Sequence, residues 1–443
     1  MAKPTRCCGT EWTKKALIIT AIVATLVAVG VTVGLAVGLT RRNNDSPTGR
    51  FASSPYTALS SQKGTPDLVA TGLPGIRSLL FDDSTGVLLA VVKGTQQIVS
   101  IAVKPPSAAD NSKVVLIDAS QAKLKLNHGI AMDDAYLYAS SATTVYRWKY
   151  DRKSPTIDVA TREIFINNID GADPNSDTAA GHITRTIVLD RNWMYVSVGS
   201  AGNVDRDSSR SKVRRFAYKS ATTLPIDYQK GEVWADGVRN AVSMAFDARG
   251  AVWIAVNGAD DLARPDLAPD MVQDSPVEPI YKLNGPANAF YGYPYCFVAG
   301  NTTGTFATDT NAGKVYAWPD FMNDGTHTDA WCQNPANVIL PDAMVPAHAA
   351  PLAAQFHTET GDMYLALHGS WNRNIPSGYS LVRLPFTPAG TPTTNRVTDT
   401  IMWLTAGPCA YGGSCFRPAG LAIVGDVAYV SSDNTGDIVR VKL

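Results

Sequence analysis

The chain has 443 residues, and 39 Lys and Arg residues stand against 39 Asp and Glu residues, so its formal net charge at pH 7 is zero. No global electrostatic field therefore recruits nucleic acid or an anionic membrane, although local patches remain possible. Hydrophobic residues make up 45% of the chain, as is ordinary for a globular protein, and 35 Gly with 27 Pro residues indicate many turns.

The N-terminal region contains an apolar stretch that is long enough to cross a bilayer. The stretch runs from Ala16 to Leu39 without a charged residue, and Lys14 and Lys15 precede it. A cleaved signal peptide is the alternative, but its apolar core would normally have about 7 to 15 residues. The sequence therefore predicts a transmembrane helix over 16–39, preceded by a tail over 1–15.

The cysteines indicate on which side of the membrane the chain after residue 39 lies. Four of them lie in the large domain, and the simplest pairing is Cys296–Cys332 with Cys409–Cys415. Disulfides require an oxidising compartment. We therefore expect the domain outside the cell or in the secretory lumen.

Two glycosylation sequons agree with this orientation. They begin at Asn44 and Asn301, on the same side of the span as the paired cysteines. Residues 1–15 are then cytosolic. Cys7 and Cys8, next to the membrane, are either palmitoylated or free thiols, and free thiols are the simpler expectation.

Residues 40–65 are polar, rich in Ser and without periodicity, so they are expected to form a flexible tether. After them one unit recurs: a turn with Gly or Asp, an alternating strand, a second turn and another short strand. The first strands of these units are Gly86–Val92, Ala135–Ser140, Trp193–Val198, Ala251–Val256, Asp362–Leu367 and Asp426–Ser431.

Six such units predict an all-β, six-bladed β-propeller over 66–443, in which short sheets repeat around an axis. Successive units follow one another at similar intervals, except that the interval between the fourth and the fifth is much longer. That gap most simply holds one long insertion, about 260–347. Seven blades, with a degenerate one inside the insertion, is the alternative.

Polar side chains cluster just before or just after these strands. They are His128, His182, Arg185, Arg239, Asn240, His348, His368, Trp371, Arg373 and Arg417. Because such loops converge at one end of a propeller axis, we expect these side chains to meet there. His327 and His357 fall outside the pattern and are expected to be structural, whereas His128 fits either role.

Convergent cations predict an anionic ligand. Several Arg residues around one pocket repel one another unless a polyanion compensates, and guanidinium groups match carboxylates in bidentate geometry. A neighbouring His is suited to accept a proton near neutral pH. A metal site made of the four clustered histidines is disfavoured, because an Arg beside each set would repel a divalent cation.

Several segments carry a family resemblance. They are Gly181-His-Ile-Thr-Arg-Thr-Ile, Met194-Tyr-Val-Ser-Val-Gly-Ser, Gly237-Val-Arg-Asn, Tyr291-Gly-Tyr-Pro-Tyr-Cys, His368-Gly-Ser-Trp-Asn-Arg and Arg417-Pro-Ala-Gly. In this order, from about Leu68 to Leu443, the chain resembles the glucose/sorbosone dehydrogenase family, and within it the pyranose dehydrogenases that use pyrroloquinoline quinone (PQQ). The resemblance implies a six-bladed propeller that binds PQQ across the axial pocket, with calcium near the cofactor.

The resemblance also implies roles for single residues. His182 resembles the base that takes a proton from the sugar hydroxyl while hydride passes from that carbon to the C5 carbonyl of PQQ. Arg239, with Asn240 beside it, resembles the arginine that stabilises negative charge on the quinone oxygens. The remaining candidates for cofactor binding are Arg77, Arg185, His348, His368, Trp371, Arg373 and Arg417. PQQ carries three carboxylates, which is the polyanion that the arginines call for.

The acidic pair Asp260 and Asp261 is the candidate calcium site, since hard oxygen ligands suit that ion. The chain has no Cys-X-X-Cys-His haem motif, so we expect electrons to pass to a separate acceptor, such as a cytochrome or a quinone-like compound.

The sequence thus predicts a membrane-anchored PQQ-dependent sugar dehydrogenase. Two alternatives stay open at this point: a metal-dependent propeller lactonase, and a surface-displayed binding propeller without catalysis, because a fold alone does not determine chemistry.

Overall fold

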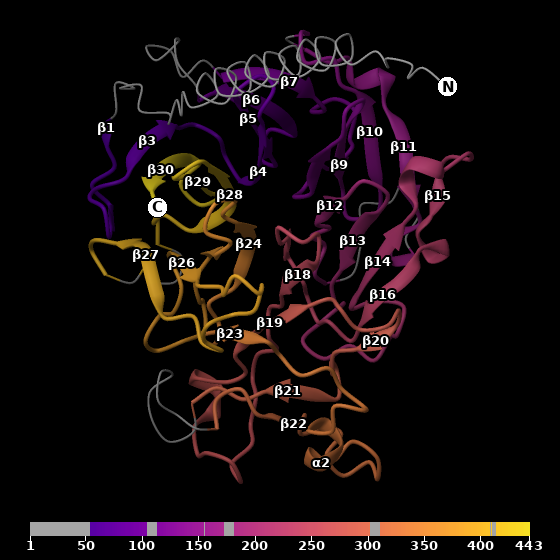
Figure 1. Cartoon of the computed structure of the whole chain (residues 1–443), viewed down its shortest axis with the longest axis vertical. Helices are drawn as coiled ribbons and strands as arrows, with labels where there is room; N and C mark the ends of the chain where they lie inside the picture. Colours follow the sequence, from indigo (N-terminus) through magenta and orange to yellow (C-terminus); the bar gives the residue numbers. More distant parts are fainter. Residues whose placement is uncertain are drawn as a thin grey trace, which may run out of the picture. The chain divides into compact units, whose positions relative to one another are not determined.

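Six small antiparallel sheets surround a central axis and form a six-bladed β-propeller (Figure 1). The computed structural model describes residues 54–103, 113–154, 156–171, 181–301, 311–407, 409 and 413–443. All of them belong to one unit, Gly49–Leu443. The fold class predicted from the repeated hairpins is confirmed, and each predicted first strand is the second strand, counted from the axis, of one blade.

The first three blades follow the chain outward from the axis. Blade 1 contains β4 (Ile76–Asp82), β5 (Val87–Val92), β6 (Gln97–Ala102) and β7 (Lys113–Asp118). Blade 2 contains β8 (Ile130–Met132), β9 (Tyr136–Ser140), β10 (Val145–Lys149) and β11 (Glu163–Asn167), with β15 (Ile226–Asp227) added in parallel. Blade 3 contains β12 (Ile187–Leu189), β13 (Met194–Val198), β14 (Lys212–Phe216) and β16 (Glu232–Asp236), with β20 (Ala289–Phe290) added in parallel.

The other three blades complete the ring. Blade 4 contains β17 (Ser243–Phe246), β18 (Val252–Ala255), β19 (Glu278–Lys282) and β23 (Ala343–Val345). Blade 5 contains β24 (Pro351–Phe356), β25 (Met363–Leu367), β26 (Ser380–Leu384), β27 (Asp399–Leu404) and β2 (Leu59–Ser61). Blade 6 contains β28 (Pro418–Val424), β29 (Val427–Ser432), β30 (Asp437–Lys442), β3 (Asp67–Ala70) and β1 (Ser54–Pro55).

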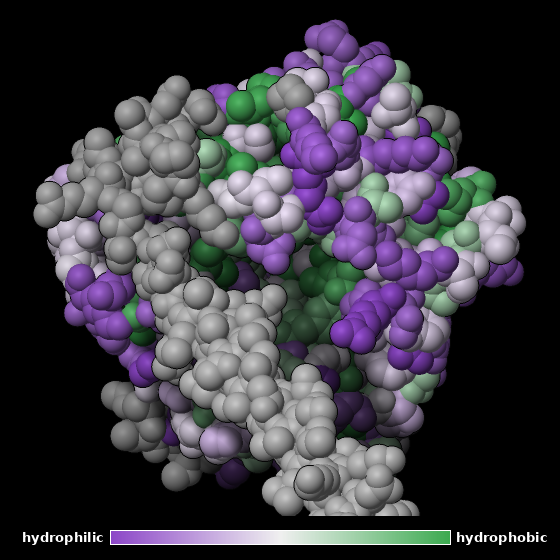
Figure 2. All heavy atoms as spheres, turned by 45° about the horizontal axis from the view of Figure 1, so that its top comes forward, coloured by the Kyte–Doolittle hydropathy of each residue, from purple (hydrophilic) through white to green (hydrophobic). Residues whose placement is uncertain are grey.

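The innermost strands enclose the axis. Each of β4, β8, β12, β17, β24 and β28 contacts the next around the ring, and β28 contacts β4. Their side chains line an axial channel of about 550 Å³, which is largely apolar. Figure 2 shows hydrophobic side chains gathered in the hollow near the centre of the visible face.

Strands from the N-terminal end of the described chain close the ring. β3 pairs with β30 on the outer side of the last blade, and β2 pairs with β27 of blade 5. The polar composition of residues 54–65 predicted a tether, but in the structure this range contains β2, which is part of blade 5. Leu59 is 1% exposed in the core between blades 5 and 6, and Tyr56 donates a hydrogen bond to Asp437.

The long insertion lies inside blade 4, between its third and fourth strands. β21 (Cys296–Val298), β22 (Val315–Ala317) and the short helix α2 (Asp329–Cys332) project from the ring there (Figure 1). The expected bounds, 260–347, were too wide, because β19 and β23 fall within them and belong to the blade. The disulfides Cys296–Cys332 and Cys409–Cys415 are both confirmed.

A cross-strand ladder recurs in four blades. In each, an Arg on the third strand faces a Tyr on the second strand and forms an ion pair with an acidic residue on the fourth. The sets are Tyr138–Arg147–Glu163, Tyr195–Arg215–Glu232, Tyr364–Arg383–Asp399 and Tyr429–Arg440–Asp67, with N–O distances of 2.6, 2.7, 2.6 and 3.0 Å. Cross-strand pairs of this kind each contribute a fraction of a kcal/mol and fix the register.

Apolar contacts between neighbouring blades form most of the core. Leu89 and Ile98 of blade 1, for example, pack with Leu137 and Trp148 of blade 2. Equivalent buried clusters lie between the other blades. The blades are therefore held by hydrophobic burial on both faces, and their loops are free to carry polar groups.

The predicted transmembrane helix over 16–39, together with the tail 1–15 and Asn44, lies outside the described residues. Within the part of the chain that the structure describes, no helix has the length and hydrophobicity needed to cross a bilayer.

Gly129, at the start of the innermost strand of blade 2, provides a test of blade packing. A Cβ atom there would lie 2.3 Å from the carbonyl oxygen of Arg185 and 2.6 Å from Oγ of Ser140. We expect Gly129→Ala to lower the free energy of unfolding by about 1–3 kcal/mol through overpacking, as measured by chemical denaturation. Gly202→Ala is the control, because no heavy atom lies within 4 Å of the position that its added methyl group would take. Equal denaturation midpoints for the two variants would contradict this account of the packing.

Candidate active site

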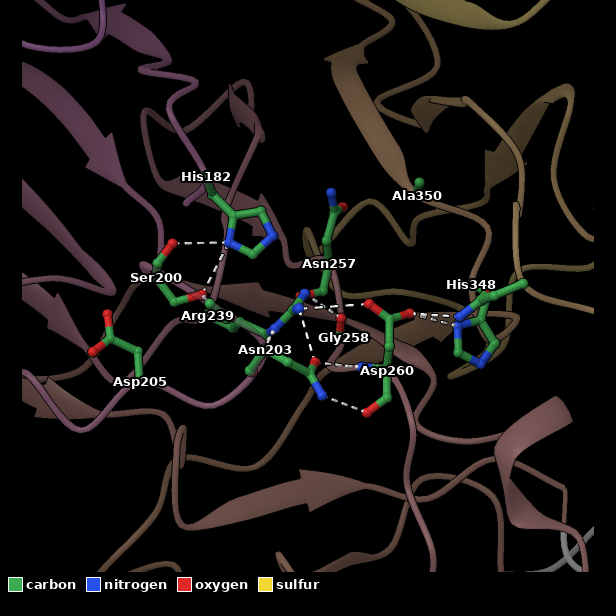
Figure 3. Close-up of polar contacts among 12 residues, drawn as sticks. His182, Ser200, Asn203, Asp205, Arg239, Asn257, Gly258, Asp260, His348 and Ala350 are labelled. Carbon is green, nitrogen blue, oxygen red and sulfur yellow. Dashed lines mark hydrogen bonds and ion pairs between the residues drawn. The ribbon is translucent and has the colours of Figure 1, made fainter. Parts of the chain in front are cut away.

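Loops of blades 3, 4 and 5 meet around a polar cavity of about 120 Å³ at one end of the axis (Figure 3). Its lining residues lie just before a first strand, just after a second strand, or at the start of a third. They are His182, Arg239, Asn240, Asn257, Gly258, Asp260, Glu278, His348, Ala350, Trp371 and Asn372. Five residues predicted to bind the cofactor or to catalyse are thus brought together.

The His182 ring is oriented by Ser200. Nδ1 lies 3.0 Å from the carbonyl oxygen of Ser200 and 2.9 Å from its Oγ. Because a carbonyl oxygen only accepts, Nδ1 carries the hydrogen and Nε2 keeps its lone pair. Burial, followed by the positive charge of Arg239, lowers the pKa of His182 to about 4. The imidazole is therefore neutral at neutral pH, with a free acceptor atom.

The Arg239 guanidinium is 6% exposed and is surrounded by acceptors. Nε donates to the Asn203 carbonyl oxygen at 3.2 Å, and Nη2 donates to Asn203 Oδ1 at 3.1 Å. Nη1 donates to the Gly258 carbonyl oxygen at 2.5 Å, and Asp260 lies 3.6 Å from Nη2. Burial lowers the pKa of Arg239, but a guanidinium remains charged at neutral pH.

Asp260 connects Arg239 with a second histidine. His348 Nδ1 lies 3.3 Å from Asp260 Oδ1, and Asn372 donates to the same oxygen at 2.8 Å. His348 Nε2 lies 2.8 Å from the Val272 carbonyl oxygen, so both ring nitrogens face acceptors. Burial lowers the pKa of His348, but the hydrogen bond to Asp260 and the charge of Glu278 outweigh it and raise the pKa above its usual value.

A second group of predicted residues lies on the other side of the axis, and we call it the Asp433 cluster. His368 Nε2 donates to Asp433 Oδ1 at 2.8 Å, and Arg77 Nη1 donates to Asp433 Oδ2 at 2.6 Å. Arg77 Nε also donates to His128 Nδ1 at 3.4 Å. Arg417 donates to the carbonyl oxygens of His368 and Gly369. None of these side chains lines the cavity, so their contact with a cofactor stays a prediction.

The loop that follows β25 links the two groups. Its first residues, His368 and Gly369, belong to the contacts of the Asp433 cluster, whereas Trp371 and Asn372 line the cavity. The Trp371 side chain is 57% exposed at the edge of the cavity. The motif segment His368–Arg373 therefore contacts both groups at this end of the propeller.

Two predicted cofactor-binding residues have other roles. Arg185 is fully buried, and its guanidinium donates to the carbonyl oxygens of Ala142, His182 and Thr184. The side chain turns into the interface between blades 2 and 3, where it supports the His182 loop, and it does not line the cavity, so its contact with a cofactor stays a prediction.

Arg373 also points away from the cavity lining. Its Nη2 donates to Asp274 at 2.6 Å, and Nη1 contacts the Ala347 carbonyl oxygen at 3.4 Å. Arg373 is not among the residues that line the cavity, and Asp274 engages its charge, so its role in cofactor binding stays a prediction.

The residues at 260–261 do not fit the predicted calcium site. Asp260 is engaged by His348, Asn372 and Arg239, while Asp261 is exposed and outside the cavity. Within the described ranges, no group of three or more His, Cys, Asp or Glu side chains is placed to hold a metal ion. The guanidinium of Arg239, beside Asp260, repels a divalent cation at this position.

The histidines expected to be structural lie away from the cavity. His327 stacks on Tyr295 at 3.7 Å and contacts Asp324, and buried His357 accepts hydrogen bonds from the backbone of Glu359 and Thr360. His128 is 2% exposed beside the axial channel. Asn301 is partly buried, and its glycosylation stays a prediction, as does that of Asn44.

The sequence did not single out several of the residues that hold these groups, among them Ser200, Asn203, Asp433 and Glu278. Asn203 and Asp433 lie in the loops that follow the second strands of blades 3 and 6, as Asp260 does in blade 4, and this shared placement is the signal that could have found them. Glu278 had no such signal, because it lay in what read as an insertion, although it begins the third strand of blade 4.

Comparison with known proteins shows the family of the chain. Residues 62–443 match the profile of the TrAA12-like family. The chain belongs to the TrAA12-like family. This TrAA12-like chain is 31% identical over 398 residues to a pyrroloquinoline quinone-dependent sugar dehydrogenase of Hypocrea jecorina, covering 84% of the chain and 86% of the relative. The family resemblance predicted from the motifs is confirmed.

A second relative is longer. A pyrroloquinoline quinone-dependent pyranose dehydrogenase of Coprinopsis cinerea is 30% identical over 392 residues, which cover 81% of the TrAA12-like chain and 51% of the relative. The chain thus spans about half the length of that protein. It covers 98% of a solved structure described as the holo form of the pyranose dehydrogenase PQQ domain from Coprinopsis cinerea, with 28% identity, a TM-score of 0.75 and 88% of the chain matched.

Asn203 provides a test of how the cavity is held. Its Oδ1 accepts from Arg239 Nη2 and from the Asp260 amide, and its Nδ2 donates to the Asp260 carbonyl oxygen at 2.7 Å. Asn203→Ala leaves a buried cation and an amide short of an acceptor, so we expect a loss of about 1–3 kcal/mol in the free energy of unfolding. Urea denaturation measures this loss, with exposed Asn192→Ala as the matched control. If both variants unfold like the wild type, Asn203 does not hold these groups.

Proposed function

We propose that the chain is a PQQ-dependent sugar dehydrogenase that oxidises a sugar hydroxyl carbon with His182 as the general base. The observation that carries this proposal is the His182 ring: Ser200 holds Nδ1, and Nε2 is left as an acceptor in a cavity beside Arg239. The family membership and the names of the relatives support the cofactor and the substrate class.

The cavity residues fit a planar anion such as PQQ. Arg239 supplies positive charge, His348 has a raised pKa that favours its charged form, and Asn240 supplies an amide. The exposed Trp371 ring at the edge offers a flat apolar surface. These residues would hold the cofactor, and the cations of the Asp433 cluster are the further candidates for its carboxylates.

PQQ, when bound, supplies a quinone that accepts the hydride from the sugar carbon. His182 Nε2 accepts the proton of the sugar hydroxyl, so that negative charge does not build up on the alcohol oxygen as the hydride leaves. The Ser200 carbonyl oxygen holds Nδ1–H and stabilises the imidazolium that forms. The acceptors of Arg239 fix its side chain before any ligand arrives. Its positive charge would stabilise the negative charge that the quinone gains.

Reconstitution tests the function directly. The full chain, in detergent, is incubated with PQQ and then with a panel of pyranoses and aldoses, and reduction of an artificial dye is followed. We expect dye reduction that needs both PQQ and a sugar. Cofactor binding without turnover of any sugar would contradict the dehydrogenase and favour a binding propeller.

We also propose that residues 16–39 anchor the chain, with residues 1–15 in the cytosol and the propeller outside or in the secretory lumen. The uncharged apolar stretch supports an anchor, and the two disulfides support an oxidising compartment. A separate electron acceptor remains a prediction. Recovery of the full chain in the soluble fraction after membrane sedimentation would contradict the anchor.

His182→Ala tests the general base. We expect kcat/KM for the sugar to fall by about a hundredfold or more, which is the usual effect of losing such a group. PQQ affinity should change little, since Arg239 and His348 remain. His327→Ala, outside the cavity, is the control and should keep its activity. Unchanged turnover of the His182 variant would rule out its role as base.

The pH profile of kcat/KM tests the state of His182. Because the pKa of His182 is lowered to about 4, the ring is unprotonated above that pH, and activity should be lost only as the pH falls toward 4. An ordinary histidine would lose its basic form near pH 6.5. An acidic limb near pH 6.5 would contradict the environment described for His182.

A further inference from the structure

Glu278 is a buried carboxyl group in the cavity wall that the proposed reaction does not use. It begins β19 and is 3% exposed. Oε2 accepts from the Gly258 amide at 2.5 Å, and Oε1 accepts from the Ala350 amide at 3.4 Å. Among the described residues no Lys, Arg or His forms an ion pair with it within 4.0 Å, although the side chain borders the same cavity as His182.

Titratable and charged groups from four surrounding loops line the same cavity as this carboxyl group. They are His182 before β12, Arg239 before β17, Asp260 after β18 and His348 before β24. On β23, the neighbouring strand, its partner is the apolar Val345. His182 is neutral at neutral pH, so the fixed charges in this cavity are the Arg239 guanidinium and the Asp260 carboxylate, and His348, whose pKa is raised, lies beside Asp260.

An anionic cofactor adds negative charge to this cavity. PQQ carries three carboxylates, and any of them that enters beside Asp260 and Glu278 raises the pKa of these two groups, because like charges in a buried site disfavour ionisation. Contacts with Arg239, His348 and Asn372 stabilise the charged form of Asp260. Glu278, in contrast, accepts only backbone hydrogen bonds. Glu278 is therefore the group that can give up its charge.

We propose that Glu278 takes up one proton from solvent when PQQ enters the cavity, so that cofactor binding and protonation of this carboxyl group are coupled. The proton adds to a carboxylate oxygen of Glu278, and no other bond forms or breaks. The coupling rests on the proposed function, because it needs PQQ to occupy this cavity.

The pH range follows from the state of Glu278 before binding. Burial raises the pKa of Glu278 to about 7, even though the amide of Gly258 opposes the shift. Below pH 6 the group is protonated with or without PQQ, so it contributes no pH dependence. Above pH 7 the free protein has lost the proton and the complex regains it, so PQQ affinity falls as the pH rises.

Calorimetry of PQQ binding to the full chain tests the coupling. Titrations at pH 6, 7 and 8, in pairs of buffers with different ionisation enthalpies, give the number of protons taken up. We expect almost none at pH 6, about half a proton at pH 7 and close to one at pH 8. Glu278→Gln, the neutral isostere, should abolish this uptake and bind PQQ about tenfold more tightly than the wild type at pH 8.

Control variants separate Glu278 from its neighbours. Glu278→Asp keeps the ionisable carboxyl group and should restore proton uptake, whereas Glu359→Gln, an exposed carboxyl group outside the cavity, should leave the uptake as in the wild type. If Glu278→Gln does not fold, infrared difference spectra of the wild type decide the matter, since PQQ addition at pH 8 should create a protonated carboxyl band.

The outcomes distinguish the two proposals. PQQ binding without proton uptake, uptake that persists in folded Glu278→Gln, or a missing carboxyl band would overturn the coupling and leave the dehydrogenase standing. A wild-type chain that does not bind PQQ would overturn the proposed function together with the coupling.

Discussion

The buried guanidinium of Arg239 and its acceptors determine how the loops at this end of the propeller are arranged. A charge removed from water is costly unless hydrogen bonds and an opposite charge replace its hydration. Asn203 of the blade 3 loop and the Asn257–Asp260 segment of blade 4 meet that requirement together. Two loops that are distant in sequence are thus fixed against one side chain, and the cation stands ready before a ligand binds, which is the condition for electrostatic catalysis without reorganisation.

Two histidines in this cavity have opposite protonation tendencies, and their neighbours explain why. His182 is placed against a carbonyl oxygen and close to Arg239, so burial and the positive charge lower its pKa. His348 lies between a carboxylate and a second carbonyl oxygen, and its pKa is raised. Pairs of titratable groups whose pKa values are driven apart are typical of sites that separate an acid or a cation from a base. In the proposed reaction, one residue type would therefore serve both as the base and as part of the wall that binds the anion.

The ring architecture explains why such a site can be polar without weakening the fold. Apolar clusters between blades and the Tyr–Arg–acid ladders on their outer strands hold the sheets. The loops at the axial end contribute little to that core, so they can carry buried charges. Blades 3, 4 and 5 supply the cavity, while Arg77 of blade 1 and Asp433 of blade 6 complete the cluster opposite, and the loop after β25 touches both.

The repeated hairpins were sufficient to predict the six blades, because strand alternation and turn residues are local properties of the sequence. The family motifs likewise singled out His182 and Arg239, and the position of His348 just before a strand singled out that residue. Local composition gave a different expectation where tertiary contacts determine the structure. The composition of residues 54–65 predicted a tether, yet β2 in this range pairs with β27, which lies near the opposite end of the chain. Arg185 and Arg373 share the spacing of the site arginines, but they turn to carbonyl oxygens and to Asp274. The packing of the blades against one another decides which strand-end side chains reach the axis. It also decides whether Asp260 meets a calcium ion or a guanidinium. That packing brings together atoms from several blades, and a pattern read along one chain does not contain those distances.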